Sequence, residues 1–410
     1  MRRVPRRLRA VASVAAATAS LLPSVLPGAA SATAFGAAPS PVGLPVIPSA
    51  LAPGQPCTSA SPTQAHAQPW TVGALSLPRL RQLSQGAGVT VAVVDTGVGT
   101  GVSALAGRVT AAGGAGRDCV GHGSFAAGLI AGSVDEAVGG GIAPQARILA
   151  VRGTAPRGIA TPGMVAAGIR SAANAGARVI YVGATLTTGR AELTAAVAYA
   201  TRKDALVVAP AAPDAAPAAA PGVVPSAPPP QPYFPAFIPQ VVSVADFGSD
   251  GARPKDAPGV FAADLVAPGD AVVSVGPKGA GNFIGSGSSL AAAFVAGTAA
   301  LVRAYQPRLT TAEVASRLVV SAYPAAMPVL DPYAAITAVP SAAGAPAAGP
   351  GAPVRMPAQA PSGPRTRALI IASVGGGVVA LMAAAAVVVP LGRARRWRPA
   401  RGRTESSSTT

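Results

Sequence analysis

The chain has 410 residues, and its 48 glycines and 43 prolines follow no repeat, which indicates long irregular segments beside a folded part. Its formal charge of +17 gathers at the two ends, because residues 1–9 carry five Arg and residues 392–410 carry six Arg and one Glu. No basic stripe interleaved with aromatic residues crosses the middle of the chain, so its composition argues against a nucleic-acid partner.

Residues 1–34 have the pattern of a signal peptide. Five Arg precede an apolar, Ala-rich run, and small residues suited to cleavage follow at Ala30–Ala34. An uncleaved signal anchor is the alternative, although Pro23 and Pro27 interrupt the run. Residues 35–72 then form a Pro-rich N-terminal arm with little periodicity.

The chain holds two cysteines, Cys57 in this arm and Cys119 in the segment that follows. In an exported protein, an even number of cysteines indicates a disulfide. Two unrelated buried thiols are the alternative, since spacing alone does not prove a bridge.

Residues 73–338 alternate strand and helix patterns. β-Branched runs predict buried strands, and apolar residues at helical spacing predict helices between them. The strands are expected at Gly88–Val98, Arg147–Arg152, Arg178–Gly183, Ala205–Val208 and Gln240–Ala245, and the helices at Pro162–Ala175 and Ala191–Lys203. This alternation predicts a three-layer α/β/α fold with a mainly parallel central sheet. A Pro-rich insertion, residues 209–232, interrupts the domain.

The C-terminal part has the pattern of a membrane anchor. A Pro/Ala/Gly-rich linker, residues 339–366, leads to a predicted transmembrane helix at residues 367–391, in which the 24 residues from Ala368 to Leu391 carry no charge. A buried core helix is the weaker alternative, because the run is apolar on all sides. The Arg-rich tail, residues 392–410, is expected in the cytoplasm by the positive-inside rule, which puts the domain on the outer side of the cell membrane.

Three motifs carry the candidate chemistry. Asp95 lies at a predicted strand end in VVDTG, His122 opens a small-residue helix in GHGSFAAG, and Ser289 starts another in GSGSSLAAAFVAG. A serine hydroxyl needs an adjacent base to become a nucleophile, imidazole suits that task, and a carboxylate orients the imidazole. The chain order Asp, His, Ser is that of subtilisin, whereas a lipase-like hydrolase would place its His last.

The chain contains so few histidines that few residues can serve as the catalytic base. The chain contains only His66 and His122, and His66 lies in the Pro-rich arm, where we expect a solvated bystander. Two histidines and sparse acidic residues also argue against a metal site, so we expect neither a metal nor a cofactor.

Residues 75–325 resemble the subtilisin-like serine proteases, and within them the mycosins, the membrane-anchored proteases of type VII secretion systems. The shared motifs are RDCVGHG at Arg117–Gly123, GIAPQAR at Gly141–Arg147, LVAPG at Leu265–Gly269, the serine motif and the helix at Leu309–Ala322. The resemblance implies that Asp95 orients His122, that His122 is the general base, and that Ser289 attacks the peptide carbonyl. It also supports a Cys57–Cys119 bridge, and it implies a polypeptide substrate and partners in the secretion machinery.

The chain departs from the family where the oxyanion is stabilised. Subtilases place an Asn after a strand of the type predicted at Ala205–Val208, but here Pro213 falls at that position, with Asp214 next to it. Neither side chain replaces a neutral N–H donor, and an ionised Asp214 would repel the oxyanion. Losing the donor costs about 10²–10³ in turnover. The backbone N–H of Ser289 and the hydroxyl of Ser288 are the donors that remain.

The substrate-binding strand is changed as well, with Gly183 in a segment where the family has an Asn-x-Ser pattern. Two functions therefore follow. One is a slow serine endopeptidase of narrow specificity outside the membrane, which the intact Asp95, His122 and Ser289 favour. The other is a catalytically impaired subtilase that braces a secretion complex, which the missing Asn favours.

Overall fold

The computed structural model describes residues 43–135, 139–215, 229–338 and 363–395. The predicted signal peptide, most of the linker, residues 216–228 of the insertion and the end of the basic tail lie outside the described residues. The chain divides into two units, Met1–Val339 and Pro340–Thr410.

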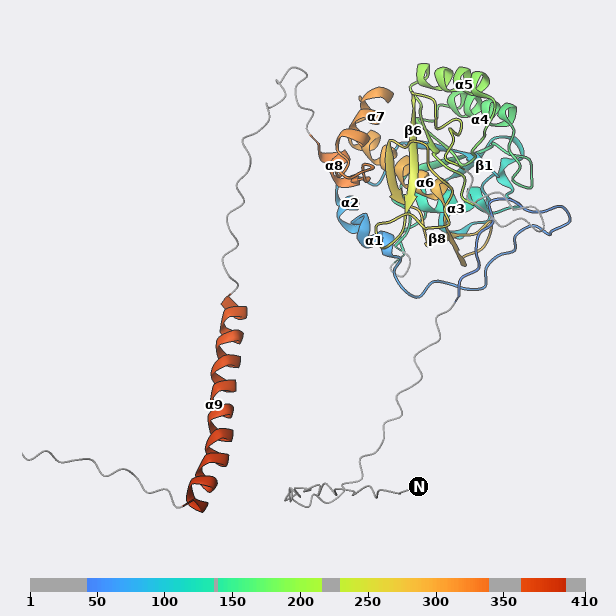
Figure 1. Ribbon diagram of the computed structural model, residues 1–410. Coiled ribbons are helices and arrows are strands. Elements are labelled where there is room, and N and C mark those ends of the chain that lie inside the picture. The colour runs from blue at the N-terminus through green and yellow to red at the C-terminus, as the bar shows by residue number, and fades with distance from the viewer. Residues whose placement is uncertain (1–42, 136–138, 216–228, 339–362, 396–410) are drawn as a thin grey trace, which may run out of the picture. The chain divides into compact units, whose positions relative to one another are not determined.

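In the described part of the first unit, seven parallel strands form one sheet with the order β2-β3-β1-β4-β5-β6-β7 (Figure 1). A separate antiparallel pair joins β8 to β9. The strands are β1 Thr90–Asp95, β2 Val109–Ala111, β3 Arg147–Arg152, β4 Val179–Val182, β5 Leu206–Pro210, β6 Val241–Phe247, β7 Leu265–Pro268, β8 Val272–Val275 and β9 Asn282–Gly285.

Helices connect and cover these strands. They are α1 Trp70–Ala74, α2 Leu77–Leu83, α3 His122–Ala131, α4 Pro162–Asn174, α5 Arg190–Arg202, α6 Ser288–Tyr305, α7 Thr311–Val320 and α8 Pro332–Thr337, with short 3-10 turns at Ser103–Leu105 and Gly113–Gly116. The helices predicted at Pro162–Ala175, Ala191–Lys203 and Leu309–Ala322 match α4, α5 and α7 within two residues at either end.

Side chains alternate between two cores along the central strand β1. Val91 and Val93 pack into the core that contains α3 and α6, whereas Ala92 and Val94 pack into the core that contains α4 and α5. Successive side chains of a strand point to opposite faces, so both faces of the sheet are buried. The predicted three-layer α/β/α fold with a parallel sheet is confirmed.

The N-terminal arm packs against the domain. Its Ile47 donates its backbone N–H to the carbonyl of Ile284 at 2.9 Å, beside a bridge between Val46 and Ile284. The predicted disulfide between Cys57 and Cys119 is confirmed. Helical structure begins at Trp70, before the end of the predicted irregular arm at residue 72, because the Trp70 indole donates to the carbonyl of Asp270 at 3.1 Å and its ring packs on Phe247. Tertiary contacts therefore order a segment without sequence periodicity.

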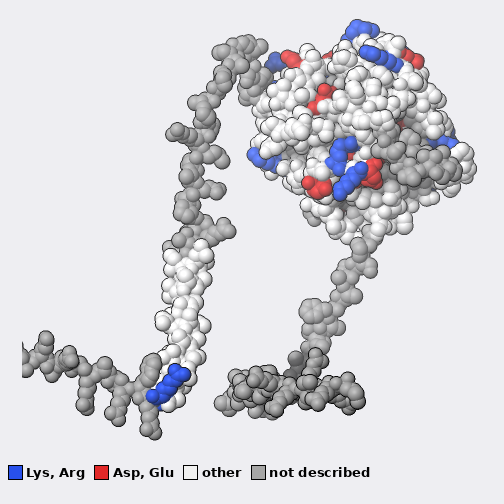
Figure 2. All heavy atoms as spheres, in the orientation of Figure 1, with Lys and Arg blue, Asp and Glu red and all other residues white. Residues whose placement is uncertain are grey.

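The described part of the second unit is the single helix α9, Gly363–Ala394. Its stretch Ala368–Ala394 has a mean hydropathy of 2.3 with none of it buried, so it is a candidate membrane span. Helix α6 passes the same test of length and composition, but 89% of it is buried, which identifies it as a core helix. Figure 2 shows no charged side chain along the helix from Ala368 onward until its C-terminal end, where blue side chains mark Arg393 and the adjacent Arg395.

Candidate active site

Asp95 ends β1, the strand that pairs with β3 on one side and β4 on the other. Parallel sheets gather functional groups at the carboxyl ends of their strands, so this position points to a site. The carboxylate is 2% exposed and accepts the backbone N–H of Thr96 at 2.6 Å. A buried, anchored carboxylate can orient a neighbouring donor.

His122 is the first residue of α3, and buried Asp118 anchors the turn before it. One Asp118 oxygen accepts the Gly121 N–H at 2.7 Å and the Thr96 hydroxyl at 2.9 Å, and the other accepts the Ser124 N–H at 2.9 Å and the Ser124 hydroxyl at 2.8 Å. Burial raises the pKa of Asp118, although these hydrogen bonds act in the opposite direction. The network ties the start of α3 to the residue after Asp95, and thereby positions the imidazole.

Ser289 is the second residue of α6, the helix buried against the sheet. The N-terminal N–H groups of a helix have no partner within the helix and can bind negative charge. Gly287, which precedes the helix, has φ of 146°, a backbone conformation that favours glycine. Ser289 itself is 1% exposed.

Folding brings the three motif residues within hydrogen-bonding distance. His122 Nδ1 lies 2.8 Å from Asp95 Oδ2, and His122 Nε2 lies 3.0 Å from Ser289 Oγ. This is the arrangement in which a carboxylate orients an imidazole that faces a hydroxyl nucleophile. The chain can thus support acyl transfer to Ser289.

A fourth residue, Asp214, enters this arrangement from the segment after β5. Its Oδ1 accepts the backbone N–H of Ser289 at 2.9 Å, and its Oδ2 accepts the Ser289 hydroxyl at 2.7 Å. The same Oδ2 lies 3.1 Å from His122 Nε2. Of the two residues considered for the oxyanion position, Asp214 and not Pro213 makes these contacts.

The remaining predicted site residues point to other partners. The Ser288 hydroxyl donates to Asp246 Oδ1 at 2.6 Å, so its hydrogen is directed there. Gly183 lies against Asp95 instead, because a Cβ at this position would be 1.9 Å from Asp95 Oδ2. Any side chain at this position would require Asp95 to move.

Sequence reasoning missed two residues of the site. Asp118 stood in a quoted motif, and an acidic residue six positions before Ser124 could have been recognised as an anchor for a helix start. Tyr181 gave no signal, since it lies within an apolar strand. Its buried hydroxyl has no hydrogen-bond partner in the described structure, and burial, with the charges of Asp95 and Asp214, raises its pKa well above the ordinary value.

The protonation of His122 reflects its two carboxylate neighbours. Burial by itself would lower the pKa of the imidazole, but the charge of Asp95, the hydrogen bonds to Asp214 and Asp95, and the charge of Asp214 together raise it well above 6.5. The two carboxylates therefore favour the protonated imidazole, whereas a general base must be unprotonated to accept the proton of Ser289.

The raised pKa predicts a pH-dependent stability. A histidine whose folded pKa exceeds its unfolded value of 6.5 stabilises the fold fully below that pH, and this stabilisation is lost as the pH rises through the folded pKa. Between about pH 6 and 9, the thermal unfolding midpoint of the wild type should fall more than that of His122→Gln, whose side chain does not titrate. Parallel curves for the two proteins would contradict the raised pKa.

The site opens into a cleft of about 520 Å³. The N-terminal arm, Val46–Ala50, lines one side of it, and His122, Asp214 and Leu290 contribute to the rest.

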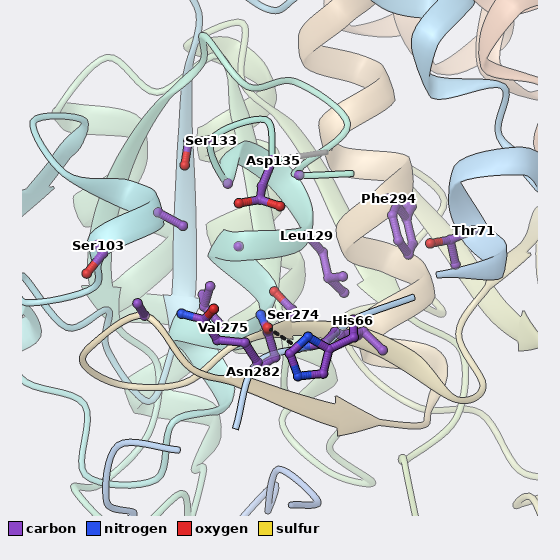
Figure 3. Close-up of a pocket in the computed structure, with 18 residues that line it drawn as sticks. His66, Thr71, Ser103, Leu129, Ser133, Asp135, Ser274, Val275, Asn282 and Phe294 are labelled. Carbon is purple, nitrogen blue, oxygen red and sulfur yellow. Dashed lines mark hydrogen bonds between the residues drawn. The ribbon is translucent and has the colours of Figure 1, made fainter. Parts of the chain in front are cut away.

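A second cavity, of about 330 Å³, lies away from the triad between the arm, α3 and β8–β9 (Figure 3). His66 lines it, next to Asn282, whose side-chain oxygen accepts the backbone N–H of Ala65 at 2.8 Å. None of the three motif residues lines this cavity. His66 is solvent-exposed, in keeping with its prediction as a bystander.

Comparison with known proteins agrees with the fold. The subtilase family (Peptidase_S8) matches residues 86–351. The structure of MycP3 protease from the type VII (ESX-3) secretion system is 31% identical, with a TM-score of 0.58 over 72% of this chain and 98% of that one. MycP1 from Mycobacterium smegmatis is 29% identical, with a TM-score of 0.58 over 69% and 89% of the two chains.

A further similar structure is a chain of the periplasmic assembly from the ESX-5 inner membrane complex. It is 28% identical, with a TM-score of 0.59 over 75% of this chain and 94% of that one. No curated protein sequence matches this chain significantly.

Proposed function

The chain belongs to the subtilase family, and on that premise we propose that it is a membrane-anchored serine endopeptidase that acts outside the membrane in type VII protein secretion. The observation that carries the proposal is the hydrogen-bonded line from Asp95 through His122 to Ser289. Family membership implies serine protease activity, and this line supplies the groups for it.

In the proposed mechanism, a peptide binds in the cleft beside the arm. His122 takes the proton of Ser289 as the hydroxyl attacks the carbonyl carbon, and Asp95 stabilises the resulting imidazolium. The backbone N–H of Ser289, at the start of α6, faces the developing negative charge. His122 then returns the proton to the leaving amine, and water hydrolyses the acyl-enzyme by the reverse roles.

The remaining features of the chain support the proposed location. The exposed apolar helix Ala368–Ala394 is long enough to cross a bilayer once, and the Arg residues that follow it favour a cytoplasmic C-terminus. The domain would then face outward, as the predicted signal peptide requires. MycP1 and MycP3 are described as proteases of type VII secretion systems, and their similarity supports a partner in such machinery.

A second candidate function is a subtilase of low activity that serves as a structural subunit of a secretion membrane complex. The contact of Asp214 with Ser289 favours it, because a carboxylate replaces the usual amide donor. The similar chain in the ESX-5 periplasmic assembly is consistent with such a role.

A fluorophosphonate probe, which phosphonylates activated serines, tests the two functions. The endopeptidase should be labelled in the wild type and not in Ser289→Ala, and secretion should fail in a strain that carries only Ser289→Ala. Normal secretion with Ser289→Ala, together with lost secretion on deletion of the gene and no labelling of the wild type, would favour the structural subunit.

A further inference from the structure

The position of Asp214 has a consequence for catalysis that rests on the proposed function. An oxyanion donor must lie about 2.7–3.1 Å from the place where the charged oxygen develops. The Ser289 N–H meets Asp214 Oδ1 at 2.9 Å. A carboxylate oxygen of this chain thus lies where the carbonyl oxygen of a substrate would have to bind.

The second carboxylate oxygen of Asp214 contacts the two groups that start the proposed reaction, the Ser289 hydroxyl and the His122 imidazole. Asp214 Oδ2 accepts the Ser289 hydroxyl at 2.7 Å, and it lies 3.1 Å from His122 Nε2. The hydroxyl of Ser289 is thus within reach of two acceptors, Asp214 Oδ2 at 2.7 Å and His122 Nε2 at 3.0 Å. The carboxylate therefore competes with the base for the serine proton.

The carboxylate fits closely against the start of α6. A Cβ at Gly287 would lie 2.1 Å from Asp214 Oδ1, so the carboxylate fills space that only a glycine leaves free. The Asp214 side chain is 13% exposed, which leaves it a path into the cleft that it lines.

From this geometry we propose that Asp214 is an internal competitor for the oxyanion position, which holds the active site in a resting state and limits the rate of acylation. The side chain must leave, or give up its charge, before a substrate carbonyl can accept the Ser289 N–H. Asp214 thereby puts a hydrogen-bond acceptor where subtilases have an amide donor. It also occupies the backbone N–H of Ser289, which is the donor that remains.

The groups that face Asp214 determine how its charge acts. The imidazole of His122 from α3 lies beside it, and Asp95 from β1 binds the opposite ring nitrogen. Ser289 is its partner on α6, and its charge also acts on Tyr181 from β4. Two carboxylates on one imidazole stabilise the imidazolium. Removing the charge at position 214 should therefore release a proton from His122 at lower pH and also free the oxyanion position.

The test uses the full-length protein in detergent and measures the rate constant of fluorophosphonate labelling against pH. Asp214→Asn keeps the shape of the side chain and supplies an N–H donor, so we expect labelling about 10²-fold faster than in the wild type, with its pH midpoint moved to lower pH. Asp214→Ala removes the carboxylate without adding a donor. It should show a smaller gain in rate with the same direction of pH change.

Matched controls separate this proposal from general effects. Asp256→Asn removes one exposed carboxylate elsewhere on the domain and should leave the rate unchanged. Asp214→Asn combined with Ser289→Ala should not be labelled. Equal or slower labelling of both Asp214 variants relative to a labelled wild type would overturn the competitor role and leave the proposed function standing. No labelling of any folded variant would overturn both.

Discussion

Replacing His122 by alanine is expected to lower peptide hydrolysis by about 10⁴-fold. Loss of the histidine costs about 10⁶ in kcat where subtilisin has its full oxyanion site. The kcat of the wild-type protein here should already be about 10² lower than that of subtilisin, because Asp214 lies where the amide donor belongs. Steady-state hydrolysis of a panel of peptide substrates, compared with the wild type, measures the loss.

The chain itself offers the matched control for this experiment. His66→Ala removes the only other histidine, which is exposed and lines a cavity away from the triad. The His66→Ala variant should hydrolyse the peptides at the rate of the wild type. If His122→Ala retained the wild-type rate, or if His66→Ala lost it, the assignment of the general base to His122 would be wrong.

Deleting residues 367–410 is expected to transfer the protein from the membrane fraction to the medium. The stretch Ala368–Ala394 supplies the apolar length for a bilayer span, and the first unit has its own core and does not include it. Fractionation of cells and medium, with alkaline extraction of the membranes, measures the change. Deleting only residues 404–410 keeps the apolar helix and its Arg residues, and this shorter chain should remain in the membrane.

Orientation can be tested on the same protein. In Ser407→Cys, a membrane-impermeant maleimide should label the tail in lysed cells and not in intact ones, because the Arg residues before it favour the cytoplasm. Labelling in intact cells would reverse the proposed topology. A chain without residues 367–410 that stayed in the membrane would instead indicate an uncleaved N-terminal anchor.

Much of the fold follows from local patterns in the sequence. The β-branched runs and helical spacings predicted five of the strands and the main crossover helices, because such patterns reflect the period with which side chains meet a core. The short strands β2, β7, β8 and β9 went unpredicted, since runs of three or four residues carry little periodicity. The arm also had no pattern of its own, and it is ordered by partners such as Ile284 that lie far away in the chain.

The sequence by itself determined which chemical groups are available: one histidine outside the arm, a serine at a helix start, a carboxylate at a strand end and a pair of cysteines. Only the tertiary structure decided which acidic residue reaches Ser289. The sequence placed Pro213 at the oxyanion position, within an irregular Pro-rich segment, but Asp214 is the residue that hydrogen-bonds Ser289 once β5 and α6 are packed together. Which side chain of an irregular segment reaches a distant helix is a property of the whole fold, and it made Asp214 a partner of both His122 and Ser289.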